Sequence, residues 1–402
     1  MNNSYMNKKF VNFSGVFQKN MLLRNIKGIM YFVDGLMSLF IKKAKYKKDN
    51  KKKVLIVYNI ALGDGVIFRC TALHLRELYP KDKYELTLIC QKGLNKIYEN
   101  DNVFDDIITI DYNKSVVNLK ERFKNFKVLR NKYYDIVIDP VGISEWTTNI
   151  FYTRMALGKE KIGLMDTNLE IHCSKRKINK IYTKIVELKE KNLSLIEYYA
   201  KFFSKLENKK IDVGLEKLNI VPNKLDLPKK YYIIFPAASM KLKRWNIDKY
   251  VELSKKIYQK TKMKMVLLGT NSDKETMDIF KQKLDVPYID LFNKTSLNDY
   301  FDVIANASLV VTNDTSAYHI AVVSEAPVAL ISGVYTYHRY MLYNFKRMNE
   351  FRKPLLIADK RKCMDCYNRC PYLKKDNENW PCLESITVDY AWKEIEKLIN
   401  KK

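Results

Sequence analysis

Short apolar runs alternate with helix-like patterns along most of the chain. Val54–Tyr58 is continuously apolar, as is typical of a strand buried on both faces of a parallel sheet, and Val66–Leu78 has helical spacing. Further strand-like runs in the first half are Tyr84–Cys90, Asp105–Ile110 and Tyr134–Pro140. A second series comprises Lys229–Pro236, Met263–Gly269, Pro287–Leu291, Ser308–Asp314 and Ala326–Gly333. The alternation predicts an α/β protein with doubly wound sheets.

The two series of strands predict two α/β domains. Between them, residues 189–227 are first helix-like and then loop-like, which suits a linker, and 402 residues are enough for two domains of ordinary size. We therefore expect domains at residues 54–227 and 228–402, preceded by a basic segment at residues 1–53. Two such sheets bind ligands where the carboxyl ends of their strands meet.

The basic segment carries an apolar stripe at three- and four-residue spacing, which predicts a helix. The stripe consists of Leu22, Ile26, Ile29, Val33, Leu36 and Phe40. Arg24, Lys27 and Asp34 interrupt the segment, so it lacks the run of about 20 nearly uncharged residues that a membrane span needs. No small-residue cleavage site follows, which argues against a signal peptide. Two interpretations remain: an interfacial helix backed by polybasic "IKKAKYKKDNKKK", or a helix packed on the protein's own body.

Charge limits the range of partners. The formal net charge is +27, and residues 1–53 alone contain thirteen Lys and Arg against two Asp. Such a surface favours nucleic acid, anionic lipid or phosphorylated substrates, although part of the excess is what a general coding bias would produce. The chain has no zinc-finger or aromatic-basic signature, so we do not expect nucleic acid as the partner.

The joint "ALGDG" between the first strand and helix places Asp64 between Gly63 and Gly65. Glycines allow tight backbone conformations and close approach of a ligand, and a helix N-terminus offers free N–H groups. Asp64 therefore has two interpretations. It could be the N-cap of a helix over Gly65–Leu78, or it could be a general base that accepts the proton of a bound hydroxyl.

Two loops in the second half offer groups suited to phosphates. "FPAASMKLKRW" follows a strand and provides Ala238, Ser239, Lys243 and Arg244. "TNDTSAYHIAV" follows another strand and opens a helix, with its polar candidates at Asp314, Thr315, Ser316 and His319. Together they predict an anion site on the second domain and a lone carboxylate on the first.

These segments resemble glycosyltransferase family 9, the ADP-heptose:lipopolysaccharide heptosyltransferases, from about Val54 to Leu398. The resemblance rests on "VLIVYNIALGDGVIFRCTALHLRELYP", "NIFYTRMALGKEKIGL", "FPAASMKLKRWNIDKYVELSKKI", "MVLLGTNSD" and "VVTNDTSAYHIAVVSEAPVALISG". It implies a GT-B fold, in which two Rossmann-like domains face a central cleft. It also implies a nucleotide-sugar donor on the C-terminal domain, an acceptor on the N-terminal one, inversion at the anomeric carbon and no required metal or other cofactor.

The resemblance assigns roles to individual residues. Asp64 is implied as the base, with Gly63 and Arg69 on the acceptor side. Asp273 falls where an acidic residue meets the nucleoside. The implied donor-phosphate residues are Ala238, Ser239, Lys243, Thr315, Ser316 and His319, and Asp314 completes the predicted donor-binding set. The sequence departs from the family where Ile60 and Ala61 replace usual serines and Ser316 replaces a usual glycine.

The resemblance implies transfer of heptose from ADP-heptose to a lipopolysaccharide-core hydroxyl by a cytoplasmic enzyme on the inner face of the cytoplasmic membrane. The acceptor would then be an anionic glycolipid. One alternative is a relative that transfers heptose to hydroxyls of autotransporter proteins. A non-enzymatic membrane- or nucleic-acid-binding protein is another, and Asp64 argues against it.

Seven cysteines fall into two groups. Cys70, Cys90 and Cys173 are scattered, as in a protein with reduced thiols. The other four cluster near the C-terminus at Cys363, Cys366, Cys370 and Cys382, a density that could hold a structural Zn²⁺ or iron ion. Members of the family commonly carry a similar tail without an obligatory metal, in which case the segment would pack the last helix onto the fold.

Overall fold

The structure is a computed structural model, and it describes residues 21–143, 148–168, 175–222, 225–343, 350–367, 370–372 and 379–400. Cys173 and residues 1–20 of the basic segment lie outside the described residues. The chain forms two compact units, which divide between Glu216 and Lys217. We call them the N-terminal and C-terminal units. The domain boundaries expected from the sequence stay predictions.

The N-terminal unit is built on a six-stranded parallel sheet in the order β3-β2-β1-β4-β5-β6. Its strands are β1 (Lys52–Val57), β2 (Tyr84–Gln91), β3 (Asp106–Ile110), β4 (Tyr133–Asp139), β5 (Leu157–Asp166) and β6 (Lys184–Leu188). Val54 in central β1 pairs with Leu86 on one side and Ile136 on the other. Residues 54–57 have no exposed surface, which explains their unbroken apolar character.

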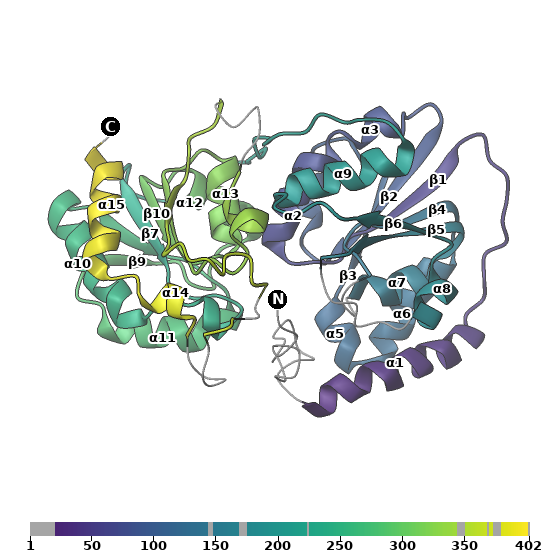
Figure 1. The fold of residues 1–402 in the computed structure, drawn as a ribbon, viewed down its shortest axis with the longest axis horizontal. Coiled ribbons are helices and arrows are strands. Elements are labelled where there is room, and N and C mark those ends of the chain that lie inside the picture. The colour runs from purple at the N-terminus through teal and green to yellow at the C-terminus, as the bar shows by residue number, and fades with distance from the viewer. Residues whose placement is uncertain are drawn as a thin grey trace. The chain divides into compact units, whose positions relative to one another are not determined.

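Helices cover both faces of this sheet, α2, α3 and α9 on one and α5 to α8 on the other (Figure 1). The helices of the unit are α1 (Met21–Leu39), α2 (Leu62–Ala72), α3 (Leu75–Leu78), α4 (Asn95–Tyr98), α5 (Tyr112–Val117), α6 (Leu119–Arg130), α7 (Thr148–Met155), α8 (Lys175–Ile181) and α9 (Leu195–Glu207). Helix α1 lies outside the layer of α5 to α8 and confirms the helix predicted in the basic segment. No described helix is long and apolar enough to cross a membrane.

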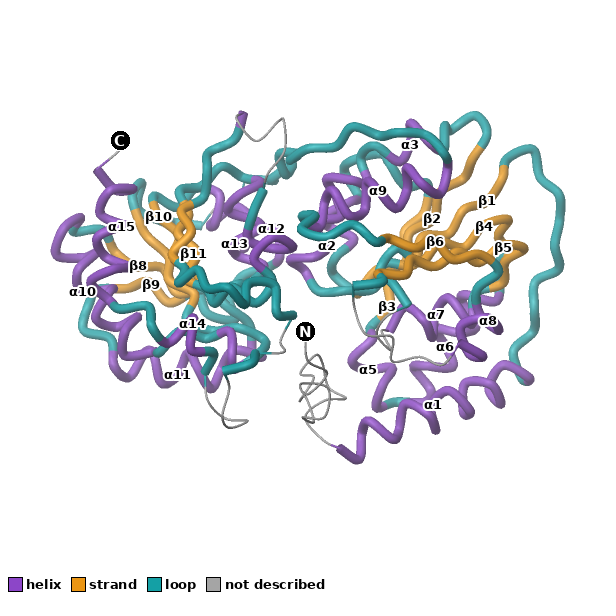
Figure 2. Tube along the Cα trace, in the orientation of Figure 1, coloured by secondary structure: helices purple, strands orange, loops and turns teal. Residues whose placement is uncertain are grey.

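The C-terminal unit repeats this plan with a parallel sheet in the order β12-β11-β10-β7-β8-β9. Its strands are β7 (Tyr231–Phe235), β8 (Lys264–Leu267), β9 (Tyr288–Asp290), β10 (Leu309–Thr312), β11 (Val328–Ile331) and β12 (Leu355–Ile357). Figure 2 shows α10, α11 and α15 on one face of the sheet and α12 and α13 on the other. Each unit is therefore a Rossmann-like domain, as predicted.

The helical segments of the C-terminal unit include short 3-10 turns and one π-helix. They are η2 (Lys241–Lys243), α10 (Ile247–Thr261), η3 (Asn271–Asp273), α11 (Lys274–Lys283), α12 (Leu297–Ala305), α13 (Ser316–Val323), the π-helix η4 (Tyr337–Met341), α14 (Pro381–Glu384) and α15 (Val388–Asn400). The last helix, α15, packs against α10 and β12. The Trp245 indole N–H donates to the carbonyl of Ile386, just before α15, at 3.0 Å and so holds the start of this helix.

The predicted strands are confirmed to within two residues at their ends, but β5, β6 and β12 were not predicted. The helix expected over Gly65–Leu78 is wrong in two respects. It begins earlier, at Leu62, and it is interrupted at Leu73 and His74 before α3.

Candidate functional site

Asp64 lies in the first turn of α2, directly after the carboxyl end of β1. The N-cap of α2 is Ala61, and no side chain caps it, so the interpretation of Asp64 as the N-cap is wrong. Its half-buried carboxylate instead sits within the turn where backbone N–H groups carry the positive end of the helix dipole. That position stabilises a carboxylate and is compatible with a general base.

Two tyrosines fix the backbone at this turn. The Tyr58 hydroxyl donates to the Asp64 carbonyl, and the Tyr98 hydroxyl donates to the Gly65 carbonyl, both at 2.9 Å. A Cβ on Gly65 would lie 3.2 Å from Ile97 Cδ1 and 3.4 Å from the Tyr98 hydroxyl. A side chain at residue 65 would therefore press on Ile97 and Tyr98, and Gly65 does not adopt the tight backbone conformation expected from the sequence.

Arg69 lies far from solvent. Its guanidinium donates two hydrogen bonds to the Asp101 carboxylate, at 2.6 and 2.7 Å, and both side chains are 3% exposed. A buried guanidinium bonded in this bidentate way holds a fold together and does not reach a ligand at the surface. We therefore leave Arg69 out of the acceptor site proposed below. Gly63 is buried in the same helix, and its predicted role stays untested.

In the C-terminal unit, the side chain of Asn313 joins the loops that follow β7 and β10. The side-chain NH2 of Asn313 donates to the Pro236 carbonyl at 2.9 Å. The side-chain oxygen accepts from the backbone N–H of Trp245 at 3.0 Å and from the Tyr250 hydroxyl at 2.9 Å. The residue is completely buried. This side chain thus attaches the loop that carries Ala238, Ser239 and Lys243 to the end of β10.

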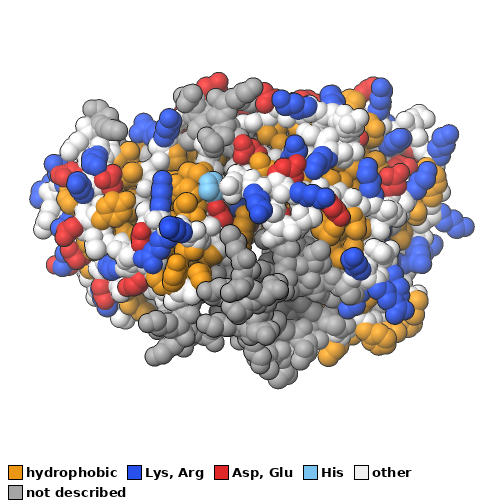
Figure 3. All heavy atoms as spheres, viewed as in Figure 1, with side chains coloured by type: hydrophobic (Ala, Val, Ile, Leu, Met, Phe, Trp, Pro, Cys, Tyr) orange, Lys and Arg blue, Asp and Glu red, His pale blue; other side chains and the backbone are white. Residues whose placement is uncertain are grey.

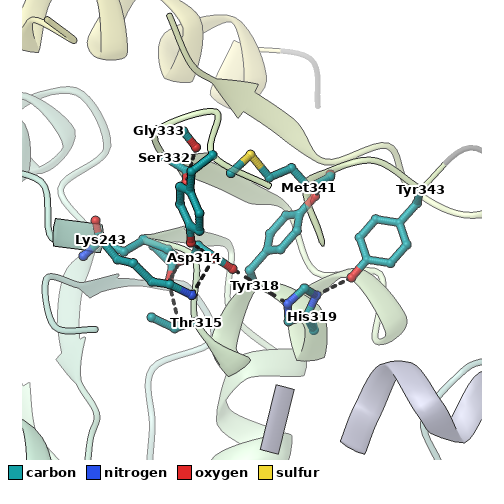
Figure 4. Close-up of polar contacts among 12 residues, drawn as sticks. Lys243, Asp314, Thr315, Tyr318, His319, Ser332, Gly333, Met341 and Tyr343 are labelled. Carbon is teal, nitrogen blue, oxygen red and sulfur yellow. Dashed lines mark hydrogen bonds and ion pairs between the residues drawn. The ribbon is translucent and has the colours of Figure 1, made fainter. Parts of the chain in front are cut away.

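Lys243 and Asp314 meet at the carboxyl end of β10 (Figure 4). The Lys243 ammonium donates to Asp314 Oδ2 at 2.9 Å and lies 5.2 Å from the centre of the Tyr335 ring. The Tyr335 hydroxyl donates to the same carboxylate oxygen. Burial raises the pKa of Asp314, but attraction to Lys243 and His319 and the hydrogen bonds from Tyr335 and Lys243 outweigh it, so the pKa is lowered overall.

Exposure separates the roles of this pair. The Asp314 side chain is 5% exposed and that of Lys243 is 20% exposed. An anion in solution can therefore reach the ammonium but not the carboxylate, which would repel it. Asp314 was predicted as a donor-binding residue. Its buried carboxylate holds the Lys243 ammonium in place, and its predicted contact with the donor stays a prediction.

His319 stands one turn into α13, with Nε2 4.0 Å from Asp314 Oδ1 and Nδ1 hydrogen bonded to the Tyr343 hydroxyl (Figure 4). Burial lowers its pKa, and the Lys243 charge adds to this effect against the opposing attraction of Asp314. The resulting pKa is about 4. At neutral pH His319 is an uncharged imidazole, so it can offer a hydrogen bond but no charge to a phosphate.

The other predicted phosphate residues surround this cluster. Ala238 is buried, and its carbonyl accepts from Arg244 Nε at 2.8 Å, while Ser239 is exposed. Thr315 is the N-cap of α13, although its hydroxyl bonds to that of Thr312 and does not cap the helix. Ser316 begins the helix. The structure thus brings Ser239, Lys243 and the α13 N-terminus to the carboxyl ends of β7 and β10.

Asp273 lies in η3, after β8 and Gly269. Its carboxylate accepts from the Thr270 N–H at 3.0 Å and forms a capping box with that residue. Gly269 has φ +147°, and a Cβ there would lie 3.1 Å from the Phe292 ring. A structural role for Asp273 is therefore evident, and its predicted contact with a nucleoside stays a prediction.

The clustered cysteines are free thiols. Cys363, Cys366 and Cys370 are partly exposed and Cys382 is buried. Burial raises the pKa of Cys382, and Cys370 and Cys363 lie near enough to raise it further. Within the described part of the chain, no group of three or more His, Cys, Asp or Glu side chains could hold a metal ion as placed. The predicted metal stays untested, and no step below depends on one.

Sequence reasoning missed Asn313, Tyr335 and the two tyrosines that hold α2. Asn313 stood inside the quoted loop "TNDTSAYHIAV", where a polar residue at the end of a buried strand was a usable signal. The sequence held no such signal for Tyr335, because this residue reaches Asp314 from the loop after another strand, 21 residues away.

Comparison with known proteins identifies the family. The model of glycosyltransferase family 9 (heptosyltransferase) matches residues 122–355, which is more than half of the chain. The chain therefore belongs to glycosyltransferase family 9 and is a glycosyltransferase. A search of curated proteins finds no match.

Solved structures show the same fold. A family 9 glycosyltransferase from Veillonella parvula has a TM-score of 0.68 at 15% identity, over 89% of this chain and 100% of that one. E. coli ADP-heptose lipopolysaccharide heptosyltransferase II has a TM-score of 0.61 at 16% identity, over 87% of this chain and 99% of that one. The iron-containing dodecameric glycosyltransferase TibC from enterotoxigenic E. coli has a TM-score of 0.54 at 14% identity, over 89% of this chain and 81% of that one. The fold is accordingly GT-B.

Proposed function

We propose that the chain transfers a heptose from ADP-heptose to a hydroxyl of a lipopolysaccharide-core glycolipid, with inversion at the anomeric carbon. The observation that carries the proposal is Lys243, which a buried carboxylate holds at the carboxyl end of a parallel sheet while its ammonium stays reachable. Ligands of open α/β sheets bind at these ends. Structures similar in fold include E. coli WaaC with ADP and with a fluorinated ADP-heptose, which supports the choice of donor.

On the donor side, the diphosphate would bind Lys243, Ser239 and the N–H groups at the start of α13. Lysine has three N–H donors, so Lys243 can keep its hydrogen bond to Asp314 and still contact a phosphate oxygen. The same charge then stabilises the ADP leaving group as negative charge develops on it. Neutral His319 adds only a hydrogen-bonding group, and Asp314 keeps the ammonium in place.

On the acceptor side, Asp64 would act as the general base. It takes the proton of the acceptor hydroxyl while that oxygen forms a bond to the anomeric carbon. The bond from this carbon to the diphosphate oxygen breaks on the opposite face, and ADP leaves with the electron pair. The hydrogen bonds from Tyr58 and Tyr98 hold the turn of α2 and so limit the positions that the carboxylate can take.

The test compares Asp64→Asn, Lys243→Ala and a control, Asp285→Asn, at a side chain that is 81% exposed. Asp64→Asn should lower kcat by about 10²- to 10⁴-fold, with donor affinity retained, because an amide cannot accept the proton. Lys243→Ala should weaken ADP binding and also lower kcat. The Lys243 ammonium would contact the donor diphosphate in the ground state and the departing ADP in the transition state. The measurements are ADP release and thermal shift with ADP-heptose. Wild-type kcat in Asp64→Asn would remove Asp64 from the reaction.

A second candidate is transfer of the heptose to protein hydroxyls. The four clustered cysteines favour it, because TibC, an iron-containing heptosyltransferase, has a similar fold. Elemental analysis of purified protein, followed by an assay of glycolipid against polypeptide acceptors with the same donor, separates the candidates. Iron in stoichiometric amount and transfer to polypeptide alone would favour the second.

A further inference from the structure

Helix α1 packs on the N-terminal unit and turns an apolar face outward, which differs in part from the stripe expected from the sequence. Met30 and Asp34 are buried on the inner side. The opposite side carries large apolar residues at the spacing of one helix face, continued by Phe40. Their exposed fractions are Ile29 59%, Phe32 66%, Leu36 45%, Leu39 77% and Phe40 80%.

Two contacts hold α1 in this orientation. Asp34 is fully buried and accepts two hydrogen bonds from the Arg122 guanidinium of α6, at 2.5 and 2.6 Å. Arg154 of α7 lies 3.6 Å from the centre of the Tyr31 ring and donates to the Tyr31 carbonyl at 2.5 Å. Turning the helix to hide this apolar face would break both contacts and expose a buried ion pair. The outward apolar face is therefore a fixed feature of the unit.

A basic segment continues directly from this face. Residues 42–53 contain eight lysines against Asp49, and seven of the eight are exposed. The segment is attached to the same unit, because Ala44 N–H donates to the Arg130 carbonyl at 2.9 Å and the Tyr46 hydroxyl donates to Asp135 at 3.2 Å. Figure 3 shows apolar side chains at the lower right, near the end of α1, with Lys and Arg side chains beside them.

We propose that the outward face of α1 and the exposed lysines of residues 42–52 form one docking surface for an anionic lipid bilayer. Apolar side chains of an interfacial helix enter the boundary between headgroups and acyl chains, while adjacent lysines attract anionic headgroups. Charge decides between occupants. A second copy of this chain would bring a like-charged segment to the same interface and repel it, whereas anionic lipid complements it. This surface does not depend on the proposed transfer reaction.

The test uses the full-length protein and sedimentation with vesicles of phosphatidylcholine, with or without phosphatidylglycerol. Phe32→Ser, Leu39→Ser and Phe40→Ser together should lower the partition coefficient on anionic vesicles at least about tenfold. These three side chains are 66–80% exposed, so the melting temperature should stay nearly unchanged. The wild type should bind phosphatidylcholine alone much more weakly, and added salt should weaken its binding to the anionic vesicles.

A matched control replaces three exposed apolar residues of the C-terminal unit, Ile279→Ser, Tyr288→Ser and Tyr390→Ser, and should bind vesicles like the wild type. Two outcomes would overturn the proposal. One is wild-type vesicle binding by the α1 variant. The other is a wild type that ignores vesicles and forms a dimer by light scattering that the α1 variant cannot form, because the face would then be an interface between copies.

Discussion

Replacing Asn313 by Ala should destabilise the C-terminal unit strongly and weaken its donor site. The substitution leaves three buried groups without the partner they have now. They are the Pro236 carbonyl, the backbone N–H of Trp245 and the Tyr250 hydroxyl. An unsatisfied buried polar group costs about 1–3 kcal/mol. Because water entry and relaxation recover part of the cost, we expect the free energy of unfolding to fall by about 3–5 kcal/mol.

Hydrogen exchange measured by mass spectrometry is the suitable assay, because a two-domain chain need not unfold in one step. Asn313→Ala should accelerate exchange in β7, β10 and the loop that carries Lys243, while β1 to β6 keep wild-type rates. Tyr250→Phe, which removes one hydrogen bond of the network, should cost only about 1 kcal/mol.

Asn306→Ala is the control for this measurement. Its side chain is exposed and bonds only within its own helix, to Asp302, among the contacts described. It should lower the free energy of unfolding by less than about 1 kcal/mol. A cost of the same small size in Asn313→Ala would refute the reasoning, since the loop would then be held by other contacts.

Two further predictions concern buried charge. The pKa of His319 falls from 6.5 to about 4 on folding. Between these values the unfolded chain binds a proton that the folded chain does not, so the free energy of unfolding falls by about 3 kcal/mol as the pH is lowered from 6.5 toward 4. The melting temperature of the C-terminal unit should therefore drop over this range in the wild type and much less in His319→Gln; equal slopes would contradict this. Asp34→Ala should cost about 3–5 kcal/mol and release α1, because it leaves the Arg122 charge buried alone, whereas Asp34→Leu with Arg122→Met should restore much of the loss. Limited proteolysis after α1 reports the release, and resistance in the single variant would argue against this anchor.

The central strands could be predicted because their burial is visible in their own residues. β7 is buried throughout and β1 is buried from residue 54 onward, and both buried stretches are unbroken apolar runs. β5 was missed because it begins with "LGKEK", whose charged residues do not indicate a strand. It can pair with β4 because residue 158 is a glycine, at which a Cβ would lie only 2.6 Å from Val137 Cγ2. That constraint is visible only once the neighbouring strand is in place.

The candidate site was predictable to a similar extent. Loops at strand ends pointed to Lys243 and Asp314, since polar residues after buried strands gather at one edge of a parallel sheet. Their separation into a reachable ammonium and a buried carboxylate depends on Tyr335, which arrives from another strand. Arg69 was predicted on the acceptor side, but the sequence could not show that Asp101, 32 residues away, would hold its guanidinium inside the unit.

The anchor of α1 also has a consequence for how the chain is made. Asp34 is synthesised 88 residues before its partner Arg122. At translation rates of about 5–20 residues per second, the anchor is absent for roughly 4–18 s after Asp34 is made. Until then α1, a helix of 19 residues, lacks the tertiary packing that supplies most of the stability of helices in proteins. The apolar and basic residues of this segment are therefore made before the domain exists to hold them, and during that interval an anionic membrane near the ribosome competes with the domain for them.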